Sequence, residues 1–234
     1  MIASNYQRVL ERIQNTALHS GRDPQSVKLV VVTKAHPIQA AEQVVQAGAR
    51  RIGENYVEEA LEKMEALADR EKIEWHMVGH IQSRKAEPVC EHFAWVHSLD
   101  SVKLARRLNR FAGQLQRTLP VLLEFNVSGE ESKYGWQASD KEQWQALLED
   151  VAQVVKQPNL QVHGLMTMAP YLTDAELARP YFIRLRELRD YLRSQFPQVA
   201  WQELSMGMSD DFEIAIQEGA TLVRIGTAIM GPRT

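Results

Sequence analysis

The feature that most constrains the fold of this chain is the alternation of short apolar runs with longer amphipathic stretches along its whole length. The first run, residues 28–33, is rich in valine and is typical of a strand buried on both faces. Similar runs predict seven further strands at residues 51–53, 75–78, 95–97, 121–126, 162–166, 203–205 and 222–225. Because a helix between two strands returns the chain to the same end of the sheet, the alternation predicts parallel pairing.

The stretches between these runs have the apolar spacing of amphipathic helices. The first predicted helix covers residues 3–19, with one apolar face formed by Tyr6, Val9, Ile13 and Ala17. Gly21 is placed to end it. Pro37 occupies the favoured first position of the next helix, which Gly48 is placed to end. Five further helices are predicted within residues 57–67, 105–115, 144–155, 181–192 and 212–216.

Eight strands with intervening helices in 234 residues indicate an α/β fold and predict one (β/α)8 TIM barrel that covers residues 1–234. The chain ends at Thr234, too soon after the last predicted strand for a final helix, so we expect the N-terminal helix to close the ring. No linker rich in Gly, Ser or Pro divides the chain. An open doubly wound sheet is the alternative that the strand pattern leaves open.

Composition excludes several classes of function. A net charge of -3 argues against a broad basic surface for nucleic acid. Cys90 is the only cysteine, which rules out an intrachain disulfide, and we expect it to pack on a helix. The seven histidines show no tight metal-ligand spacing, so no metal is expected. With no secretory signal and no apolar run near the ~20 residues of a membrane span, we expect a cytoplasmic protein without a membrane partner.

Lys34 directly follows the first predicted strand, at the end of the barrel where active groups gather. A lysine at the end of an apolar strand is partly desolvated, which lowers the pKa of its amine and favours Schiff-base chemistry. The alternative, which position alone leaves open, is that Lys34 extends its ammonium group into water.

Two loops after the last two strands predict a phosphate site. Residues 205–211 combine small side chains, whose backbone N–H groups can converge, with Ser209, which is placed to cap the following helix. Residues 224–231 contain a second turn with Gly226 and Thr227. Phosphate is commonly bound at these two positions of the barrel, although ordinary turn and capping chemistry is the alternative. A Schiff-base lysine facing a phosphate site suggests a phosphorylated aldehyde.

Seven segments, in order along nearly the whole chain, resemble the pyridoxal phosphate homeostasis protein family: residues 31–34, 53–59, 75–82, 132–135, 163–166, 204–211 and 224–231. The resemblance implies a fold-type III barrel of the alanine racemase type without that enzyme's second β domain. It implies pyridoxal 5′-phosphate bound as a Schiff base on Lys34, with Arg224 facing the pyridine nitrogen and Asn55 near the ring. The phosphate would be held by Ser205, Met208, Ser209, Gly226 and Thr227. Arg84 departs from the family pattern, which has asparagine there.

The resemblance also implies a role in the supply of pyridoxal phosphate, with indirect effects on amino-acid and keto-acid balance and no established catalytic activity. An arginine keeps its proton, so a pyridine nitrogen facing Arg224 stays unprotonated and the ring is a poor electron sink for transamination. A low-activity racemase or lyase is the alternative. It needs a second acid or base, for which Tyr56, His80 and His36 are the candidates. A Schiff-base aldolase without cofactor is a third hypothesis.

Beyond pyridoxal phosphate, the expected partners are apo-enzymes that depend on this cofactor. Nothing in the sequence demands a dimer, and we expect a monomer. Lys133 lies in the Ser-Lys-Tyr-Gly segment after the fifth predicted strand. Both a role facing the barrel mouth and an ordinary surface position are open for it.

Overall fold

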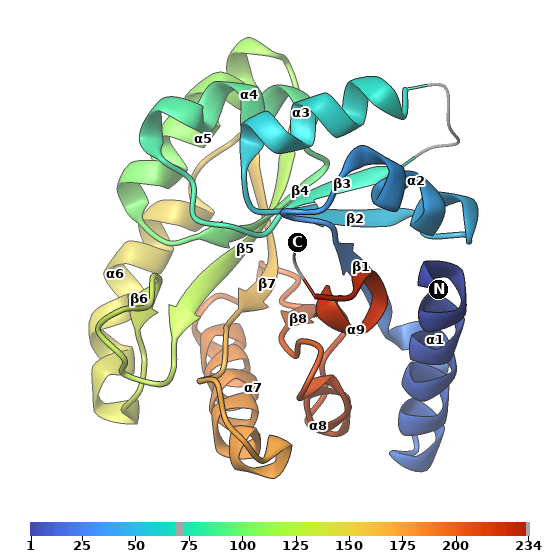
Figure 1. Cartoon of the computed structure of the whole chain (residues 1–234). Helices are drawn as coiled ribbons and strands as arrows, with labels where there is room; N and C mark the ends of the chain where they lie inside the picture. The colour runs from blue at the N-terminus through green and yellow to red at the C-terminus, as the bar shows by residue number, and fades with distance from the viewer. Residues whose placement is uncertain (69–72, 233–234) are drawn as a thin grey trace.

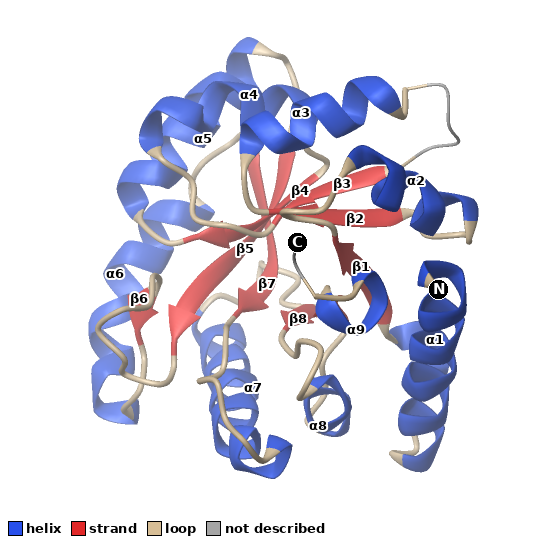
Figure 2. Ribbon diagram, viewed as in Figure 1, coloured by secondary structure: helices blue, strands red, loops and turns tan. Residues whose placement is uncertain are grey.

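Eight parallel strands form a closed barrel surrounded by helices in the computed structural model, which describes residues 1–68 and 73–232 (Figures 1 and 2). The strands pair in the order β4-β3-β2-β1-β9-β8-β7-β5, and pairing of β4 with β5 closes the ring. They are β1 (Lys28–Val32), β2 (Arg51–Glu54), β3 (Glu74–Met77), β4 (Trp95–Leu99), β5 (Leu119–Asn126), β7 (Leu160–Met166), β8 (Glu203–Ser205) and β9 (Leu222–Ile225). The predicted barrel is confirmed, and the closed ring excludes an open doubly wound sheet.

All eight predicted strands are present, with ends that differ by no more than two residues from the prediction. A short strand that the sequence did not predict, β6 (Trp136–Gln137), pairs with the end of β5. The side chains of the barrel strands alternate between the two faces of the sheet. Val30, Leu122, Met166 and Leu222 form a small apolar cluster of their own, while the flanking residues of the same strands join the larger core. The small cluster therefore lies in the barrel interior.

The larger core lies between the sheet and the helices: α1 (Ile2–His19), α2 (Ile38–Gln46), α3 (Val57–Ala66), α4 (Ala86–His92), α5 (Val102–Gln114), α6 (Trp144–Val155), α7 (Arg179–Gln195), α8 (Phe212–Gln217) and α9 (Thr227–Met230). Figure 1 shows α1 beside α2 and α9, and α1 contacts α2, α8 and α9. The N-terminal helix thus closes the ring as predicted. Within residues 1–68 and 73–232, none of the helices combines the length and the hydropathy that a membrane span requires.

Two details of the helix prediction are wrong. The single turn α9 follows the last strand, although the sequence was expected to contain no final helix. Pro37 is the residue before α2 rather than its first helical residue, because its backbone is extended, with ψ at 158°. Gly48 does follow the end of α2 and adopts a φ of +111°, a conformation that only glycine reaches without strain.

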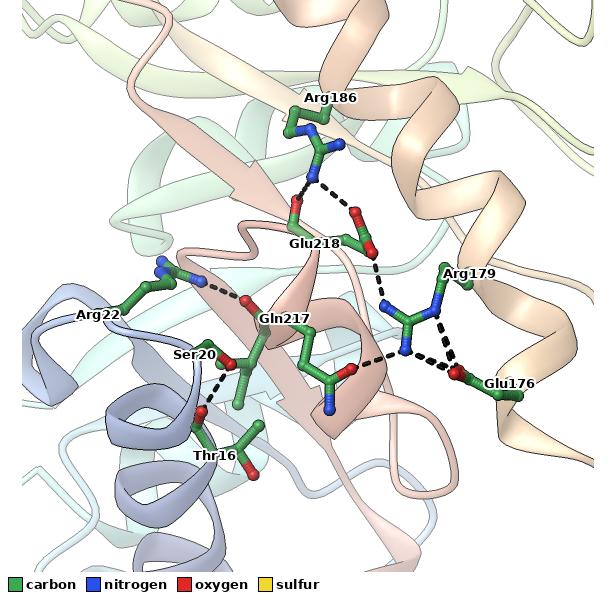
Figure 3. Close-up of polar contacts among 9 residues, drawn as sticks. Thr16, Ser20, Arg22, Glu176, Arg179, Arg186, Gln217 and Glu218 are labelled. Carbon is green, nitrogen blue, oxygen red and sulfur yellow. Dashed lines mark hydrogen bonds and ion pairs between the residues drawn. The ribbon is translucent and has the colours of Figure 1, made fainter.

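A polar network on the outside of the barrel joins α7 to the end of α8 (Figure 3). Arg179 Nη1 donates to Glu218 Oε1 over 2.6 Å, and Arg186 Nη1 donates to Glu218 Oε2 over 2.6 Å. Arg179 also donates to Glu176 and Gln217 through Nη2. The Glu218 carboxylate, with an exposed fraction of only 11%, is therefore the shared acceptor of two arginines.

We expect Glu218→Ala to lower the free energy of unfolding by about 1–2 kcal/mol, because both arginines lose a charged acceptor that is largely shielded from water. Asp190→Ala is the matched control, since the Asp190 side chain is 55% exposed and pairs only with Arg189 in the described part of the chain. That control should change stability by less than about 0.5 kcal/mol. Urea unfolding measures both variants, and equal effects would contradict the assignment of Glu218 as the centre of the network.

Candidate functional site

Lys34 lies at the mouth of the barrel, two residues beyond the end of β1, and is half-buried. Within β1, Val30 faces the barrel interior and Val31 joins the outer core. Lys34 lies in the turn that follows this strand, four residues after the inward-facing Val30. The next residue, Ala35, adopts a left-handed φ of 57°, and its backbone N–H donates to Glu59 Oε1 over 2.6 Å.

A buried ion cluster holds the backbone just before Lys34 from the outer face of the sheet. Lys63 Nζ, on α3, donates to the Thr33 carbonyl oxygen over 2.6 Å and to the carboxylates of Glu54 and Glu59 over 2.7 Å each. Thr33 Oγ1 also donates to Glu54 Oε1 over 2.5 Å. Lys63 is 2% exposed and Glu54 is fully buried, so neither charge is solvated. The cluster therefore fixes the turn that carries Lys34.

Burial raises the pKa of Glu54, while the hydrogen bonds from Lys63 and Thr33 oppose that rise. Sequence reasoning missed this cluster. It predicted a helix within residues 57–67 but did not single out Lys63, which the structure buries on the same helix face as Val57 and Ala60. A lysine three residues after Ala60, on the same face of the helix, is the signal that could have found it.

Arg224 crosses the barrel interior beneath the mouth and is 4% exposed. Its Nη1 donates to Ser205 Oγ over 2.6 Å, and its Nη2 donates to the Thr167 carbonyl oxygen over 2.8 Å. Burial lowers the pKa of Arg224 to about 10, while the nearby carboxylates of Glu124 and Asp211 oppose that change. Arg224 is therefore a charged donor at neutral pH, held in place by two acceptors.

The two predicted phosphate loops meet each other. Ser209 Oγ accepts a hydrogen bond from the backbone N–H of Ala228 over 3.1 Å. The prediction that Ser209 caps α8 is wrong, because the N-cap residue is Asp211 and the Ser209 hydroxyl reaches the other loop instead. Within residues 1–68 and 73–232, the backbone N–H groups of Ser209, Gly226 and Thr227 meet no acceptor. Donors without acceptors, converging from two loops, suit an anion.

The other two residues predicted to hold phosphate have their donors engaged. The Met208 backbone N–H donates to Asp211 Oδ1 over 2.6 Å. Ser205 is fully buried, and its hydroxyl contacts Arg224 and the imidazole of His97. Only three of the five predicted phosphate-binding residues thus present unengaged donors in this structure.

A cavity of about 430 Å³ opens at the mouth, lined by Asn55, Tyr56, Gly79, His80, Arg84, Glu124, Tyr134 and Met168 among others. The His80 ring stacks on Tyr134 with 3.8 Å between ring centroids, and its Nδ1 lies 2.9 Å from Asp100 Oδ2. Arg84 Nε donates to Gln82 Oε1 over 3.1 Å at the rim. Of the three candidate acid–base residues, Tyr56 and His80 line this cavity. His36 instead lines a separate surface depression with Pro37 and Glu59.

Glu124 is a cavity-lining residue that sequence reasoning missed. It is 3% exposed and lies in β5 between Leu123 and Phe125, which join the outer core. A carboxylate inside an otherwise apolar strand is the signal that could have found it. Burial raises the pKa of Glu124 from 4.5 to about 7; Asp100 adds to the rise and Arg224 opposes it.

This shift predicts a pH-dependent stability cost. Between about pH 4.5 and 7 the folded chain holds a proton on Glu124 that the unfolded chain has released, so stability falls as pH rises through this window. We expect Glu124→Gln to raise the free energy of unfolding at pH 8 by up to about 3 kcal/mol and to change it little at pH 4.5. Urea unfolding at both pH values tests this, with Glu131→Gln on the exposed loop as control. A pH-independent effect of Glu124→Gln would contradict the assignment.

Two other residues that the sequence singled out, Cys90 and Lys133, have hydrogen-bond or packing contacts that describe their place in the structure. Cys90 is buried on α4, as predicted, and burial raises the pKa of its thiol to about 12. Lys133 Nζ donates to the carbonyl oxygen of Met168, a cavity residue, over 3.0 Å and pairs with Glu130. Among the described residues, no group of three or more His, Cys, Asp or Glu side chains could hold a metal ion.

The chain is similar in sequence and in structure to several known proteins. The family model of the alanine racemase N-terminal domain matches residues 4–234. The pyridoxal phosphate homeostasis protein of Pseudomonas aeruginosa is 45% identical over 233 residues, which span 99% of this chain and 96% of that protein. PipY of Synechococcus elongatus, with PLP bound, superposes with a TM-score of 0.81 at 38% identity and covers 95% of this chain and 100% of its own. Alanine racemase of Streptomyces coelicolor shares the fold at 18% identity, with a TM-score of 0.71 over 97% of this chain and 58% of its own.

Proposed function

The chain belongs to the pyridoxal phosphate homeostasis proteins of the alanine racemase N-terminal domain family, and from this premise we propose that it binds pyridoxal 5′-phosphate in the barrel mouth as an intracellular reservoir of the cofactor. Lys34 provides the amine that forms a Schiff base with the cofactor aldehyde. Delivery to apo-enzymes that need pyridoxal phosphate is the role that follows from an exchangeable link of this kind.

The observation that carries the proposal is that three neighbouring strands bring the required groups to one place. β1 pairs with β9 so that Val30 lies opposite Arg224, and β9 pairs with β8 so that Leu222 lies opposite Ser205. Lys34 follows β1 at the mouth. The two loops that contain backbone N–H groups without an acceptor among the described residues follow β8 and β9 at the same end. A ligand with an aldehyde, a ring nitrogen and a phosphate matches an amine, a cationic donor and a set of N–H groups.

The residues present fit such a group. Lys34 would hold the aldehyde carbon, Arg224 would face the ring nitrogen, and Asn55, which is half-buried at the cavity wall, would lie beside the ring. The phosphate would bind the N–H groups of Ser209, Gly226 and Thr227, with Met208 joining if its N–H leaves Asp211. Ser205 would contribute by holding Arg224.

A carrier function is favoured over turnover by the state of Arg224. Its pKa of about 10 keeps the guanidinium charged at neutral pH, so it would donate a hydrogen bond to the ring nitrogen and would not protonate it. The bound cofactor then supplies a reactive aldehyde but only a weak electron sink. This disfavours transamination and leaves capture and release of amines as the accessible chemistry.

A low-activity racemase or lyase remains the second candidate because of Glu124 and His80. Both line the mouth cavity, and the pKa of Glu124, raised to about 7, would let it exchange a proton near neutral pH. Amino-acid turnover by the loaded protein, reduced at least tenfold in Glu124→Gln, would support this candidate. A turnover rate no higher than that of free pyridoxal phosphate would rule out the racemase or lyase function.

The phosphate site gives the direct test of the proposed function. Cofactor-free protein is titrated with pyridoxal 5′-phosphate and, in parallel, with pyridoxal, which has the aldehyde but lacks the phosphate. We expect pyridoxal to bind at least 100-fold more weakly, a difference of about 2.7 kcal/mol. Equal affinities would mean that the two loops do not bind phosphate, and absence of binding by either compound would refute the proposal.

A further inference from the structure

A line of buried polar side chains runs across the barrel interior beneath Arg224. Arg224 Nη1 donates to Ser205 Oγ over 2.6 Å. Ser205 Oγ lies 2.8 Å from His97 Nδ1, and His97 Nε2 lies 2.9 Å from His76 Nδ1. Ser205, His97 and His76 are each no more than 1% exposed and come from β8, β4 and β3. Branched apolar side chains usually fill this space in such barrels, so the polar line is costly to bury.

A direction can be assigned to each hydrogen bond in the line from the donors and acceptors that these groups offer. A guanidinium only donates, so Ser205 Oγ accepts from Arg224. Among the described residues, His97 Nδ1 is the only acceptor within hydrogen-bond distance of the Ser205 hydroxyl, so we assign the Ser205 proton to His97 Nδ1. His97 must then carry its own proton on Nε2 and donate it to His76 Nδ1. His76 in turn carries its proton on Nε2, which has no hydrogen-bond partner among the described residues and lies 3.8 Å from Glu74 Oε2.

These hydrogen-bond directions require both imidazoles to be neutral. The burial of both rings favours the neutral form. Complete burial lowers the pKa of His97 well below its usual value, with His76 and Arg224 adding to the effect. Burial also lowers the pKa of His76, although Glu74 opposes that change. Each imidazole therefore has one donor nitrogen and one acceptor nitrogen, as a directed line needs.

We propose that His97 and His76 are positioning residues that act through Ser205 to fix the guanidinium of Arg224 at the ligand-facing end of the line. His97 Nδ1 holds the Ser205 proton away from Arg224, which keeps the Ser205 lone pairs available to the guanidinium. The Thr167 carbonyl oxygen supplies the second anchor. The inference rests on the proposed function, in which Arg224 faces the pyridine nitrogen.

Two isosteric variants of His97 separate this role from simple packing. His97→Asn places an amide oxygen near the position of Nδ1 and keeps an acceptor for Ser205. His97→Gln places its amide near the position of Nε2, which keeps the contact with His76 but leaves the Ser205 proton without its acceptor. We expect the asparagine variant to bind pyridoxal 5′-phosphate within about threefold of the unchanged protein, with the same visible absorption maximum. The glutamine variant should bind at least tenfold more weakly and show a displaced maximum.

Nitrogen-15 NMR of the cofactor-free protein tests the line independently of any ligand. We expect His97 and His76 both to be neutral and protonated on Nε2, with Nδ1 unprotonated. Protonation on Nδ1 in either residue, or identical behaviour of the asparagine and glutamine variants, would overturn the inference. If the unchanged protein binds no pyridoxal phosphate, the proposed function fails while the tautomer pattern still decides whether the directed line exists.

Discussion

Replacing Lys34 with alanine is expected to abolish the visible absorption band of the bound cofactor while the fold stays intact. Lys34 is half-buried and follows β1 rather than forming part of it, so loss of its side chain should cost less than about 1 kcal/mol of stability. For a chain of this length, Tm should therefore fall by no more than about 2–4 °C. Absorbance of the loaded protein and thermal unfolding followed by circular dichroism measure the two effects.

Lys133→Ala is the matched control for this experiment. Lys133 also lies near the mouth cavity, and its Nζ contacts the Met168 carbonyl oxygen. This variant should keep the visible band in full. A band that survives in Lys34→Ala, or a collapse of its thermal transition, would contradict the assignment of Lys34 as a cofactor-binding residue without a structural role.

Lys63→Met is expected to be the most destabilising of the substitutions considered, lowering the free energy of unfolding by about 3–5 kcal/mol at pH 8. The methionine fills much of the same space but leaves the fully buried Glu54 and the partly buried Glu59 without their cation. The Thr33 carbonyl oxygen also loses its donor, which loosens the turn that carries Lys34. Urea unfolding measures the loss.

The pH dependence of this variant follows from Glu54. Burial raises the pKa of Glu54, and the opposing hydrogen bond from Lys63 is absent in the variant. A carboxyl whose pKa is higher in the folded than in the unfolded chain destabilises the fold when ionised and ceases to do so once protonated. The deficit of Lys63→Met should therefore shrink as the pH falls from 8 toward 5.

A double variant, Lys63→Met with Glu54→Gln, provides the control, because it removes one buried charge of each sign. Replacement of a whole buried pair costs far less than removal of one partner, so we expect the double variant to recover at least half of the loss. A single variant that loses less than about 1 kcal/mol, or whose deficit is the same at pH 5 and pH 8, would contradict the role given to the cluster.

The strands were predictable because each is a run of apolar residues that must be buried. Such a run can be recognised from its own residues, without knowledge of distant contacts. All eight were located from the sequence, together with the covering role of α1. The two-residue strand β6 and the single turn α9 were not predicted, since segments this short carry no periodicity. Their conformations depend on the strands beside them rather than on their own residues.

The candidate site was predictable only in part. Polar residues at strand ends, such as Lys34 and Thr227, are found by counting along the chain once the barrel is assumed. Contacts between distant segments are not, so the Ser209 hydroxyl was assigned to its own helix although it meets Ala228 on the next loop. Glu124 and His97 point inward because of the strand register, which the barrel closure sets and a single strand does not reveal.

Borohydride reduction of the loaded protein, followed by peptide mapping, shows directly whether Lys34 binds pyridoxal 5′-phosphate covalently in the barrel mouth. Reduction makes a Schiff base permanent, so the modified lysine can be identified by mass. We predict a single stoichiometric adduct on Lys34. An adduct on Lys133 or another lysine, or no adduct at saturating cofactor, would show that Lys34 does not hold the cofactor.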